Sequence, residues 1–335
     1  DRARKSFHRF LAAAVTSTEA FDALNAHPVA LPAAVEVFAE SEPLSECLLR
    51  QPELLGVLAA LSQRRDPSAD QQLALGLAGS EGSPGRGALR AVVSSARASS
   101  EQMGRLRQYF CHRMFRWGID SLWARHSLWE SLAEFSALAE AVIEVAFEMA
   151  QEQIGARRRG RFAVLALGRL GTRELDLGSA ADLLFLGEAP ASRNEHATWR
   201  RVAEKLIHIV SSYTHDGTLF PVDARLRPRG SEGELVQNAD SVLEYFATTA
   251  EVWEAVTYLK VRPVAGDMEF AAAWCDQLRQ VLAGHFSAWE RARSSLCAMR
   301  LRLEEEGMRG SREGLNFKTG PGGVYDLDFL VSGMS

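Results

Sequence analysis

The stretch Leu165–Leu186, LALGRLGTRELDLGSAADLLFL, decides the fold class of this chain. An apolar run of strand length, Phe162–Leu167, leads into a glycine-bounded turn, and a second strand-like run follows at Asp182–Leu186. Short continuous apolar runs between glycines are typical of buried strands. Long segments with apolar residues at helical spacing lie on both sides of this stretch. We therefore predict an α+β protein that is mostly helical and has a small mixed sheet.

The segments upstream of this stretch have a helical pattern. Apolar residues recur at spacings of three and four over residues 7–63 and again over 88–154. The aromatic residues between Tyr109 and Trp123 have the same spacing, and we expect them to form core packing. Residues 63–87 are rich in Gly, Ser and Pro, which predicts a mobile linker. We predict a helical region over residues 1–155, interrupted by this linker.

The segments downstream alternate between helical and strand-like patterns, and we predict a second, mixed domain over residues 156–335. The sequence FPVDARLRP predicts a third strand, and FKTGPGGVYDLDFLV is a glycine-rich turn that leads into an alternating run. Helical patterns, the last of them long, cover residues 196–215, 240–259 and 268–306.

Composition limits the function classes. The chain has 335 residues, 47% of them hydrophobic, and a formal net charge of −5. This length exceeds one average domain and allows a sizeable core. The acidic balance argues against a protein that coats nucleic acid, and we expect no nucleic-acid partner.

Cysteine spacing and hydropathy predict a cytoplasmic protein with no membrane association. The four cysteines are far apart in sequence, and no CxxC pair or zinc-ligand spacing occurs. No signal peptide is visible, and no apolar run approaches the ~20 residues that span a bilayer. The sequence starts at Asp1 without a methionine and stops at Ser335, so we expect a piece of a longer protein.

Two aspartates predict a site for metal-dependent phosphoryl or nucleotidyl transfer. Asp182 opens the second strand-like run, and Asp223 lies in the third. Divalent cations held by carboxylates neutralise the charge that develops in this chemistry. Carboxylates at i and i+2 on one strand share a face and can bridge two metals ~3.5–4 Å apart. Here the position two before Asp182 is Ala180, so that bridging carboxylate is missing.

Residues around the aspartates have the chemistry of a phosphate site. Gly178 and Ser179 can offer backbone N–H groups and a hydroxyl, and Gly168 allows the turn to approach a ligand closely. Arg225 lies two residues after Asp223, which would place both on one face of a strand. Lys260 and Arg262 are further candidate phosphate ligands.

Four motifs in order resemble one known family. The motifs are FAVLALGRLGTRELDLGSAADLLFL, VDARLRPRGSEGELV, WEAVTYLKVRPVAGD and FKTGPGGVYDLDFLV, and the earlier PLSECLLRQPELL is similar to the family's helical lead-in. Together they resemble one half of the glutamine synthetase adenylyltransferase/adenylyl-removing enzyme family. The resemblance implies a DNA polymerase β-type nucleotidyltransferase fold for residues 156–335, truncated at its C-terminal end.

The resemblance also implies chemistry and partners. One half of such an enzyme transfers AMP from ATP to a tyrosine of glutamine synthetase, and the other removes it by phosphorolysis with phosphate, giving ADP. Both use Mg²⁺ or Mn²⁺. By resemblance, Asp182 and Asp223 are the catalytic and metal-binding residues, and the nucleotide-binding residues are Gly168, Gly178, Ser179, Arg225, Arg227, Lys260, Lys318, Gly322 and Gly323.

The sequence departs from the family pattern at the metal site. The family's Ser-Asp-x-Asp motif becomes Ser179, Ala180, Ala181 and Asp182. Loss of a shared carboxylate is expected to slow transfer on the order of a thousandfold or more. Asp176 is ~13 Å from the vacant position in an extended chain, so it is a poor substitute. Tyr325 stands where the removing half has Arg, and Asp326 is closer to the adenylylating half, so which half this is stays open.

Alternative readings remain. The chain can be an impaired half with a regulatory role, or a working enzyme with one metal held by Asp182 and Asp223. It can also be a non-catalytic interaction module that binds glutamine synthetase or a PII signalling protein. A nucleic-acid polymerase also uses carboxylate-bound divalent cations, but of these alternatives it agrees least with the acidic composition.

Overall fold

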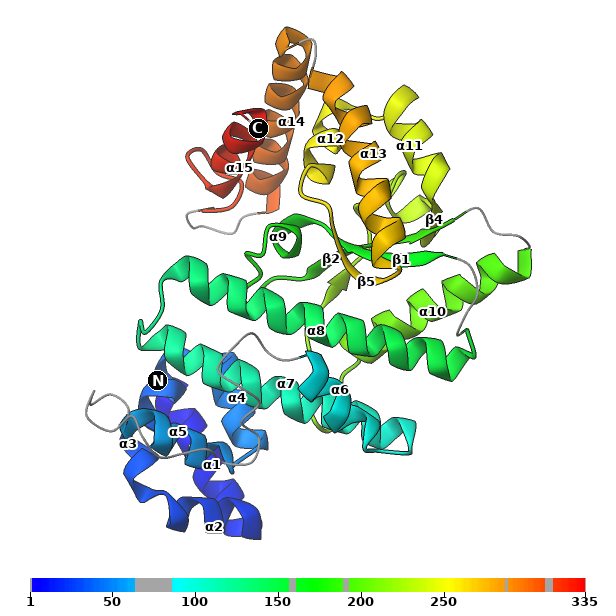
Figure 1. The fold of residues 1–335 in the computed structure, drawn as a ribbon. Coiled ribbons are helices and arrows are strands. Elements are labelled where there is room, and N and C mark those ends of the chain that lie inside the picture. Colours follow the sequence, from blue (N-terminus) through cyan, green and yellow to red (C-terminus); the bar gives the residue numbers. More distant parts are fainter. Residues whose placement is uncertain are drawn as a thin grey trace. The chain divides into compact units, whose positions relative to one another are not determined.

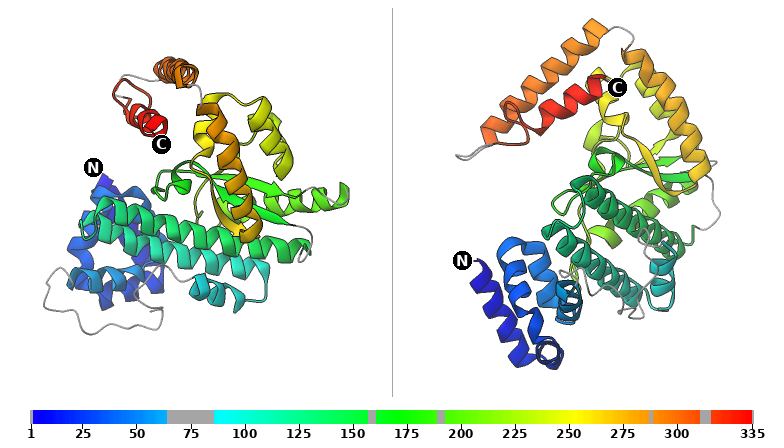
Figure 2. Two further views of the ribbon diagram at one scale, coloured as in Figure 1. Left: turned by 45° about the horizontal axis from the view of Figure 1, so that its top comes forward. Right: turned by 60° about the vertical axis from the view of Figure 1, so that its left-hand side comes forward.

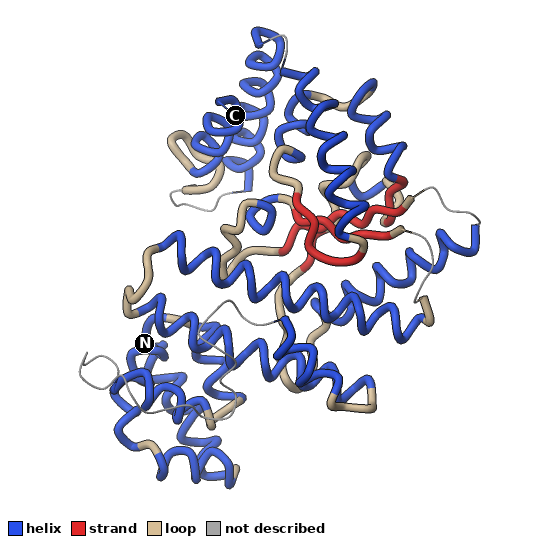
Figure 3. Tube along the Cα trace, viewed as in Figure 1, coloured by secondary structure: helices blue, strands red, loops and turns tan. Residues whose placement is uncertain are grey.

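The structure is a computed structural model that describes residues 2–63, 86–156, 161–188, 193–286, 289–310 and 316–334. Most of these residues are helical and the strands form one small mixed sheet (Figure 3), which confirms the predicted fold class. Nearly all of the predicted linker lies outside the described residues. Within the described ranges no helix is long and apolar enough to cross a membrane.

The chain forms two compact units. The first contains Asp1–Gln153, Arg173–Ala180 and Leu206–Pro221, and the second contains Ile154–Thr172, Ala181–Lys205 and Val222–Ser335. Two short segments from the middle of the chain therefore belong with the N-terminal helices. The predicted division into domains at about residue 155 stays a prediction.

The first unit is built from helices (Figure 1). In chain order they are α1 (Arg2–Thr16), α2 (Thr18–Ala26), α3 (Leu31–Glu40), α4 (Glu42–Arg50), α5 (Leu54–Gln63), α6 (Arg86–Ser94), α7 (Ser99–Leu122) and α8 (Leu128–Ile154). Serine caps start two of them, because Ser17 accepts the N–H of Ala20 and Ser41 accepts the N–H of Leu44. The helical prediction for both upstream segments is confirmed.

Aromatic packing joins α7 to α8. The rings of Trp117 and Phe135 stack with centroids 4.5 Å apart, and Phe110 lies 6.2 Å from Phe135. The indole N–H of Trp117 donates to the carbonyl of Ser131 at 2.6 Å. All three rings are buried. The aromatic stripe is therefore core packing, as its helical spacing predicted.

A buried arginine on α7 holds the segment Leu206–Pro221. Arg107 is 1% exposed, and its guanidinium donates to the carbonyls of Ile209 (3.0 Å), Ser212 (2.9 Å) and Gly217 (3.1 Å). Burial lowers its pKa from the usual value, and the carboxylate of Asp216 opposes that shift. The charged group is stabilised by carbonyl dipoles rather than by a close ion pair.

The second unit contains the sheet, whose strands are β1 (Phe162–Ala166), β2 (Ala181–Gly187), β3 (Val222–Asp223), β4 (Val236–Asn238) and β5 (Arg262–Gly266). β1 runs antiparallel to β2 and to β5. β2 is parallel to β3 near its start and to β4 near its end. β3 and β4 thus follow one another along the same edge of β2, separated by a loop. The prediction of a small mixed sheet is confirmed.

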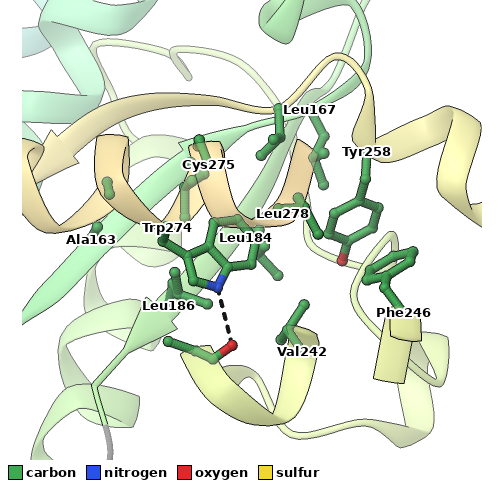
Figure 4. Close-up of a cluster of buried hydrophobic side chains, with 14 of the residues drawn as sticks. Ala163, Leu167, Leu184, Leu186, Val242, Phe246, Tyr258, Trp274, Cys275 and Leu278 are labelled. Carbon is green, nitrogen blue, oxygen red and sulfur yellow. Dashed lines mark hydrogen bonds between the residues drawn. The ribbon is translucent and has the colours of Figure 1, made fainter. Parts of the chain in front are cut away.

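One face of this sheet packs against three helices, α11 (Ala239–Thr248), α12 (Val252–Tyr258) and α13 (Met268–Phe286). The sheet contributes every second residue of its strands to this face, such as Leu165, Leu184 and Leu186. Trp274 of α13 packs among them and donates its indole N–H to the carbonyl of Ala239 at 3.0 Å (Figure 4). The predicted helix over residues 240–259 is therefore two helices, α11 and α12, and the intervening residue Ala250 packs against this core.

The other face of β1 and β2 packs against α10 (Arg193–Ser211). The ring of Trp199 stacks on Phe162 of β1 with centroids 4.5 Å apart, and Phe185 of β2 lies 6.4 Å from Phe162. Both faces of the two central strands are thus buried. That burial explains why these strands read as continuous apolar runs rather than as alternating ones.

Two helices end the described chain, α14 (Trp289–Gly310) and α15 (Val324–Met334), and they lie side by side (Figure 2). The long helical pattern over residues 268–306 thus forms two helices, α13 and α14. The alternating run after the glycine-rich turn is helical. Asp326 in the first turn of α15 accepts the N–H of Gly322 at 2.6 Å and pairs with Arg300 of α14, and both interactions support the start of a helix.

Candidate nucleotide-binding site

The tertiary structure pairs the two predicted catalytic aspartates. In the parallel ladder between β2 and β3, Asp182 is the direct partner of Asp223. Residues opposite each other on neighbouring strands project from the same face of a sheet. Asp182 also lies on the same side of β2 as Leu184 and Leu186. The two carboxylates are therefore at the end of the face that α11, α12 and α13 cover.

The backbone after β1 supports Asp182 from the other side. The N–H of Leu167 donates to the carbonyl of Asp182 at 2.9 Å. Gly168 follows with φ +52°, and a side chain there would collide with the Asp182 carboxylate. This position thus requires glycine both for its left-handed backbone and for its close approach to Asp182. A contact of Gly168 with a nucleotide stays a prediction.

The carboxyl group of Asp182 is half-buried and holds its proton unusually well. Burial raises its pKa to about 6, and the nearby charge of Asp223 acts in the same direction. Lys318 and Arg225 lower the pKa and so limit the shift. Two of the predicted phosphate-binding cations therefore lie close enough to act on Asp182.

Arg225 engages Asp223 through a multiple hydrogen bond. Its Nε lies 3.0 Å from both carboxylate oxygens, its Nη2 lies 2.6 Å from Oδ2, and its backbone N–H donates to Oδ1 at 2.8 Å. These hydrogen bonds lower the pKa of Asp223. The outer part of the Arg225 side chain faces solvent, because 77% of that side chain is exposed.

The route by which Arg225 reaches Asp223 differs from the predicted one. The sequence predicted that both residues share a face of one strand, but β3 ends at Asp223. Arg225 lies in the following turn, and the backbone hydrogen bond to the Asp223 carboxylate sets the geometry of that turn. The pairing arises because an Asp side chain readily accepts the N–H two residues later.

Arg227 holds the loop between β3 and β4 together. Its guanidinium donates to the carbonyls of Ala224 (2.5 Å), Ser231 (3.1 Å) and Gly233 (2.9 Å). The hydroxyl of Tyr258 donates to the carbonyl of Leu226 at 3.0 Å and ties the same loop to α12. In this structure Arg227 therefore fixes the loop that presents Arg225, and its predicted contact with a nucleotide stays a prediction.

Lys260 and Arg262 have different partners. The ammonium of Lys260 lies 3.3 Å from a carboxylate oxygen of Asp328 on α15. Arg262 donates to the carbonyls of Leu170 (2.9 Å) and Gly171 (3.2 Å), at the C-terminal end of the short helix α9 (Gly168–Gly171). Arg262 thus supports the turn beside Asp182. Lys260 stays a candidate phosphate ligand whose present partner is an acid.

The glycine-rich turn before α15 carries Lys318, Gly322 and Gly323. The Lys318 ammonium lies 5.6 Å from the centre of the Tyr325 ring, a cation–π distance. The carboxylate of Asp326 accepts the N–H of Gly322 and pairs with Arg300 of α14 at 2.5 Å. This turn is therefore fixed by an ion pair, while the side chain of Lys318 is exposed. Binding of a nucleotide by these three residues stays a prediction.

Gly178 and Ser179 belong to the first unit. Asp176 accepts the N–H of Gly178 at 2.9 Å and the hydroxyl of Ser179 at 2.9 Å. The N–H of Leu175 donates to the buried hydroxyl of Ser136 on α8 at 3.0 Å. Asp176 therefore folds back on its own turn, and its carboxylate takes the donors that the sequence predicted for phosphate. A role of Gly178 and Ser179 at a nucleotide stays a prediction.

Sequence reasoning missed the acidic partners on α15 as parts of the site. Asp326 and Asp328 pair with Arg300 and Lys260, each from a different helix or loop. Residues two apart on a helix point in different directions, which allows one helix to serve both partners. The acidic pattern of the final motif is a signal for such pairing, but only the fold shows which cations lie opposite.

The carboxylates present do not fit a two-metal site. Across the described ranges, no group of three or more His, Cys, Asp or Glu side chains is placed to hold a metal ion. Asp182 and Asp223 remain as a pair, and Arg225 already occupies both oxygens of Asp223. A two-metal centre needs a surplus of carboxylate charge, which this site does not provide.

Comparisons with known proteins agree on one family. The family model for glutamate-ammonia ligase adenylyltransferase matches residues 31–277. A bifunctional glutamine synthetase adenylyltransferase/adenylyl-removing enzyme of Stenotrophomonas maltophilia (strain K279a) is 30% identical over 99% of this chain. Proteins of the same description from Brucella suis biovar 1 and Pseudomonas aeruginosa are 28% and 30% identical over 99% and 88% of the chain. The chain spans about a third of their length, namely 35%, 34% and 30%.

Proposed function

Because this chain belongs to the glutamate-ammonia ligase adenylyltransferase family, we propose that it is one nucleotidyltransferase half of a glutamine synthetase adenylyltransferase/adenylyl-removing protein. We propose further that this half binds a nucleotide but transfers AMP poorly and has a regulatory role. One observation carries the proposal: Asp182 and Asp223 are paired in register on β2 and β3, while Ala180 occupies the position of the third carboxylate.

The paired aspartates support a nucleotidyltransferase origin. They lie beside the turn at Gly168, and the cations of Arg225 and Lys318 act on the same pair. Such an arrangement of acids, cations and a close glycine turn suits a polyphosphate whose reacting phosphorus lies near the carboxylates. Arg225 and Lys318 would bind and orient the phosphates, and the missing side chain at Gly168 leaves room for the carboxylate of Asp182.

The absence of a carboxylate at position 180 supports impaired transfer. The methyl group of Ala180 cannot bind a cation or orient a nucleophile. Asp176 does not replace it chemically, because its carboxylate is hydrogen-bonded to Gly178 and Ser179. The expected cost in rate is on the order of a thousandfold or more relative to an intact site.

The family resemblance implies Mg²⁺ or Mn²⁺ at Asp182 and Asp223. When bound in such a site, a divalent cation neutralises charge on the transferred phosphoryl group. The donor set described above does not suit two such ions, so we propose no step through a metal. The substrates that fit the proposal are ATP in one direction, and phosphate with formation of ADP in the other.

The partners follow from the family. The relatives are named for the adenylylation of glutamine synthetase and the removal of adenylyl groups. We propose that this chain acts on, or docks to, glutamine synthetase at the modified tyrosine, and that a PII signalling protein is a second candidate partner. We propose a cytoplasmic location, which the free cysteines at positions 47, 111, 275 and 297 support.

Transfer of labelled AMP between ATP and glutamine synthetase tests the proposal. The assay is run in both directions, with Mg²⁺ and with Mn²⁺, on this chain and on its Ala180→Asp variant. We expect measurable transfer by the variant and transfer on the order of a thousandfold slower by the unchanged chain. Comparable rates for the two proteins would show that Ala180 does not impair the site.

The alternative is a non-catalytic interaction module without a nucleotide site. Exposed apolar residues on the N-terminal helices, such as Val15 at 86% and Val29 at 66%, favour a role in protein contacts. This alternative predicts that the Ala180→Asp variant is as inactive as the unchanged chain and that neither binds ATP. Saturable ATP binding that is lost in Arg225→Gln would exclude it.

A further inference from the structure

We propose that the Asp182–Asp223 site binds a nucleotide polyphosphate without a divalent cation, and that Asp223 acts as a positioning residue for Arg225 rather than as a metal ligand. This inference rests on the proposed function, because it assumes that a nucleotide binds at this site. It concerns how the phosphate charge is neutralised, which neither family membership nor the sequence decides.

Arg225 already engages the carboxylate of Asp223. Both of its oxygens accept hydrogen bonds from Arg225, from Nε, Nη2 and the backbone N–H. A divalent cation would need lone pairs of these same oxygens, and its charge would repel the guanidinium beside them. The hydrogen bond from the Arg225 N–H holds the Asp223 carboxylate in the turn after β3, beside the guanidinium.

Two nearby cations balance the charge of the aspartate pair. Asp182 and Asp223 together carry two negative charges when both are ionised, and Arg225 and Lys318 bring two positive charges close to them. The protein itself therefore balances the carboxylates. A pair whose charge is already balanced attracts Mg²⁺ or Mn²⁺ less than two uncompensated carboxylates would, and within the described residues no third His, Cys, Asp or Glu side chain completes a group of metal ligands.

Arg225 has N–H donors that Asp223 does not engage. A guanidinium has five N–H donors in a fixed planar fork, and Asp223 engages only those on Nε and Nη2. The side chain is 77% exposed, so its remaining donors face solvent. Asp223 thus fixes the orientation of a guanidinium that presents its outer edge, the arrangement that binds a phosphate through two parallel hydrogen bonds.

Lys318 and Lys260 extend the cationic surface. Lys318 is exposed on the glycine-rich turn and close enough to act on Asp182, and Lys260 is half-buried in its pair with Asp328. Together with Arg225, these two lysines are the cations that we propose for contact with a chain of phosphates. A fixed cation differs from a metal because it remains in the site whether or not a ligand is bound.

The test measures binding, not turnover. ATP is titrated into the chain by calorimetry in EDTA and again in excess Mg²⁺, and MnCl₂ alone is titrated with detection of free Mn²⁺ by electron paramagnetic resonance. We expect ATP affinities that agree within about threefold in the two buffers and no Mn²⁺ site. Arg225→Gln should weaken ATP binding about tenfold or more in both buffers, since a charged hydrogen bond to phosphate is lost.

Two variants sharpen the comparison. Ala180→Asp adds a carboxylate to the pair, so it should gain a Mn²⁺ site and bind ATP more tightly in Mg²⁺ than in EDTA. Arg302→Gln removes an exposed arginine from an ion pair with Glu306 on α14 and should leave ATP affinity unchanged. ATP binding by the unchanged chain that requires Mg²⁺, or a Mn²⁺ site that Asp223→Asn removes, would overturn the inference.

The outcomes also separate the inference from the proposed function. Binding of ATP only in Mg²⁺ refutes metal-free binding but keeps a nucleotide site. No binding in either buffer refutes both and supports the interaction module. Fast AMP transfer by the unchanged chain, with ATP affinity equal in both buffers, refutes impaired catalysis but keeps the metal-free ground-state complex.

Discussion

Asp182 of β2 and Asp223 of β3 are direct partners in a parallel ladder. The two residues are 41 positions apart in sequence, and the short strand β3 exists only through its pairing with β2. The ladder places two acids on one face of the sheet, and Arg225 and Lys318 offset their repulsion. This relationship has consequences for pH dependence, for the glycine beside Asp182 and for the cations around the pair.

The pH dependence of stability should contain a contribution from Asp182. Its pKa is about 6 in the folded chain and 3.8 in the absence of interactions. Between these values the folded chain binds more protons than the unfolded chain, so stability falls as pH rises through that window. We expect a loss of about 1–2 kcal/mol after allowance for solvent screening of this half-buried group.

Urea unfolding in EDTA at pH 4.5 and pH 7 measures this contribution. Asp182→Asn is the matched control because the amide does not titrate. The unchanged chain should lose about 1–2 kcal/mol more than the variant between the two pH values. Equal losses in the two proteins would mean that Asp182 has an ordinary pKa.

In Asp223→Asn the carboxyl NMR titration of Asp182 should move to lower pH, because the neighbouring negative charge is removed.

Gly168→Ala should destabilise the second unit by about 1–3 kcal/mol. The added methyl group would collide with the Asp182 carboxylate, and the backbone has φ +52°. Gly187→Ala is the control, because Gly187 lies on the same strand as Asp182. A methyl group at position 187 would meet its nearest atom at 3.7 Å, and the residue needs no unusual backbone conformation. Thermal unfolding of both variants measures the difference. Similar stability of the two would contradict the close packing of Gly168 on Asp182.

Arg107→Met should destabilise the first unit by about 3–5 kcal/mol. The variant leaves the carbonyls of Ile209, Ser212 and Gly217 without their shared donor in a buried place. Arg105→Met on the same helix loses an exposed pair with Glu101 and should cost less than about 1 kcal/mol. Hydrogen exchange of residues 206–221 provides a local measurement, and unchanged protection in Arg107→Met would contradict an anchoring role.

Asp328→Asn should tighten ATP binding about threefold to tenfold. Lys260 pairs with Asp328 at 3.3 Å, so a phosphate that binds Lys260 must compete with that carboxylate. Calorimetry in EDTA measures the affinity. Glu306→Gln, which breaks the exposed pair with Arg302 on α14, is expected to have no effect. Weaker binding by Asp328→Asn would indicate that Asp328 positions Lys260 for the nucleotide instead of competing with it.

Much of the fold and the family could be predicted from the chain itself. The apolar runs at Phe162–Leu167 and Asp182–Leu186 form β1 and β2, because strands buried on both faces leave a continuous apolar signal. The four motifs pointed to the family that the comparisons confirm. The glycine at position 168 was also predicted to allow a close approach, and in the structure its backbone closely approaches the carboxylate of Asp182.

Other features required the tertiary structure. The alternating run at Val324–Met334 is a helix, because hydrogen bonds of the preceding turn and the ion pair of Asp326 with Arg300 outweigh a two-residue pattern. Arg225 reaches Asp223 from a turn and not from a strand, because β3 ends as soon as its pairing with β2 ends. Neither the length of a strand nor the partner of a lysine such as Lys260 is a local property.

The sequence by itself determined which chemical groups are available, namely two aspartates, several fixed cations and an alanine at position 180. Local spacing and motif order also determined the fold class, because periodicity reports which faces are buried. Only the tertiary structure decided that Asp182 lies beside Asp223, that Arg225 occupies both oxygens of that carboxylate, and that Asp328 holds Lys260. Charges act through distances in space, and residues far apart in the chain acquire such distances only when it folds.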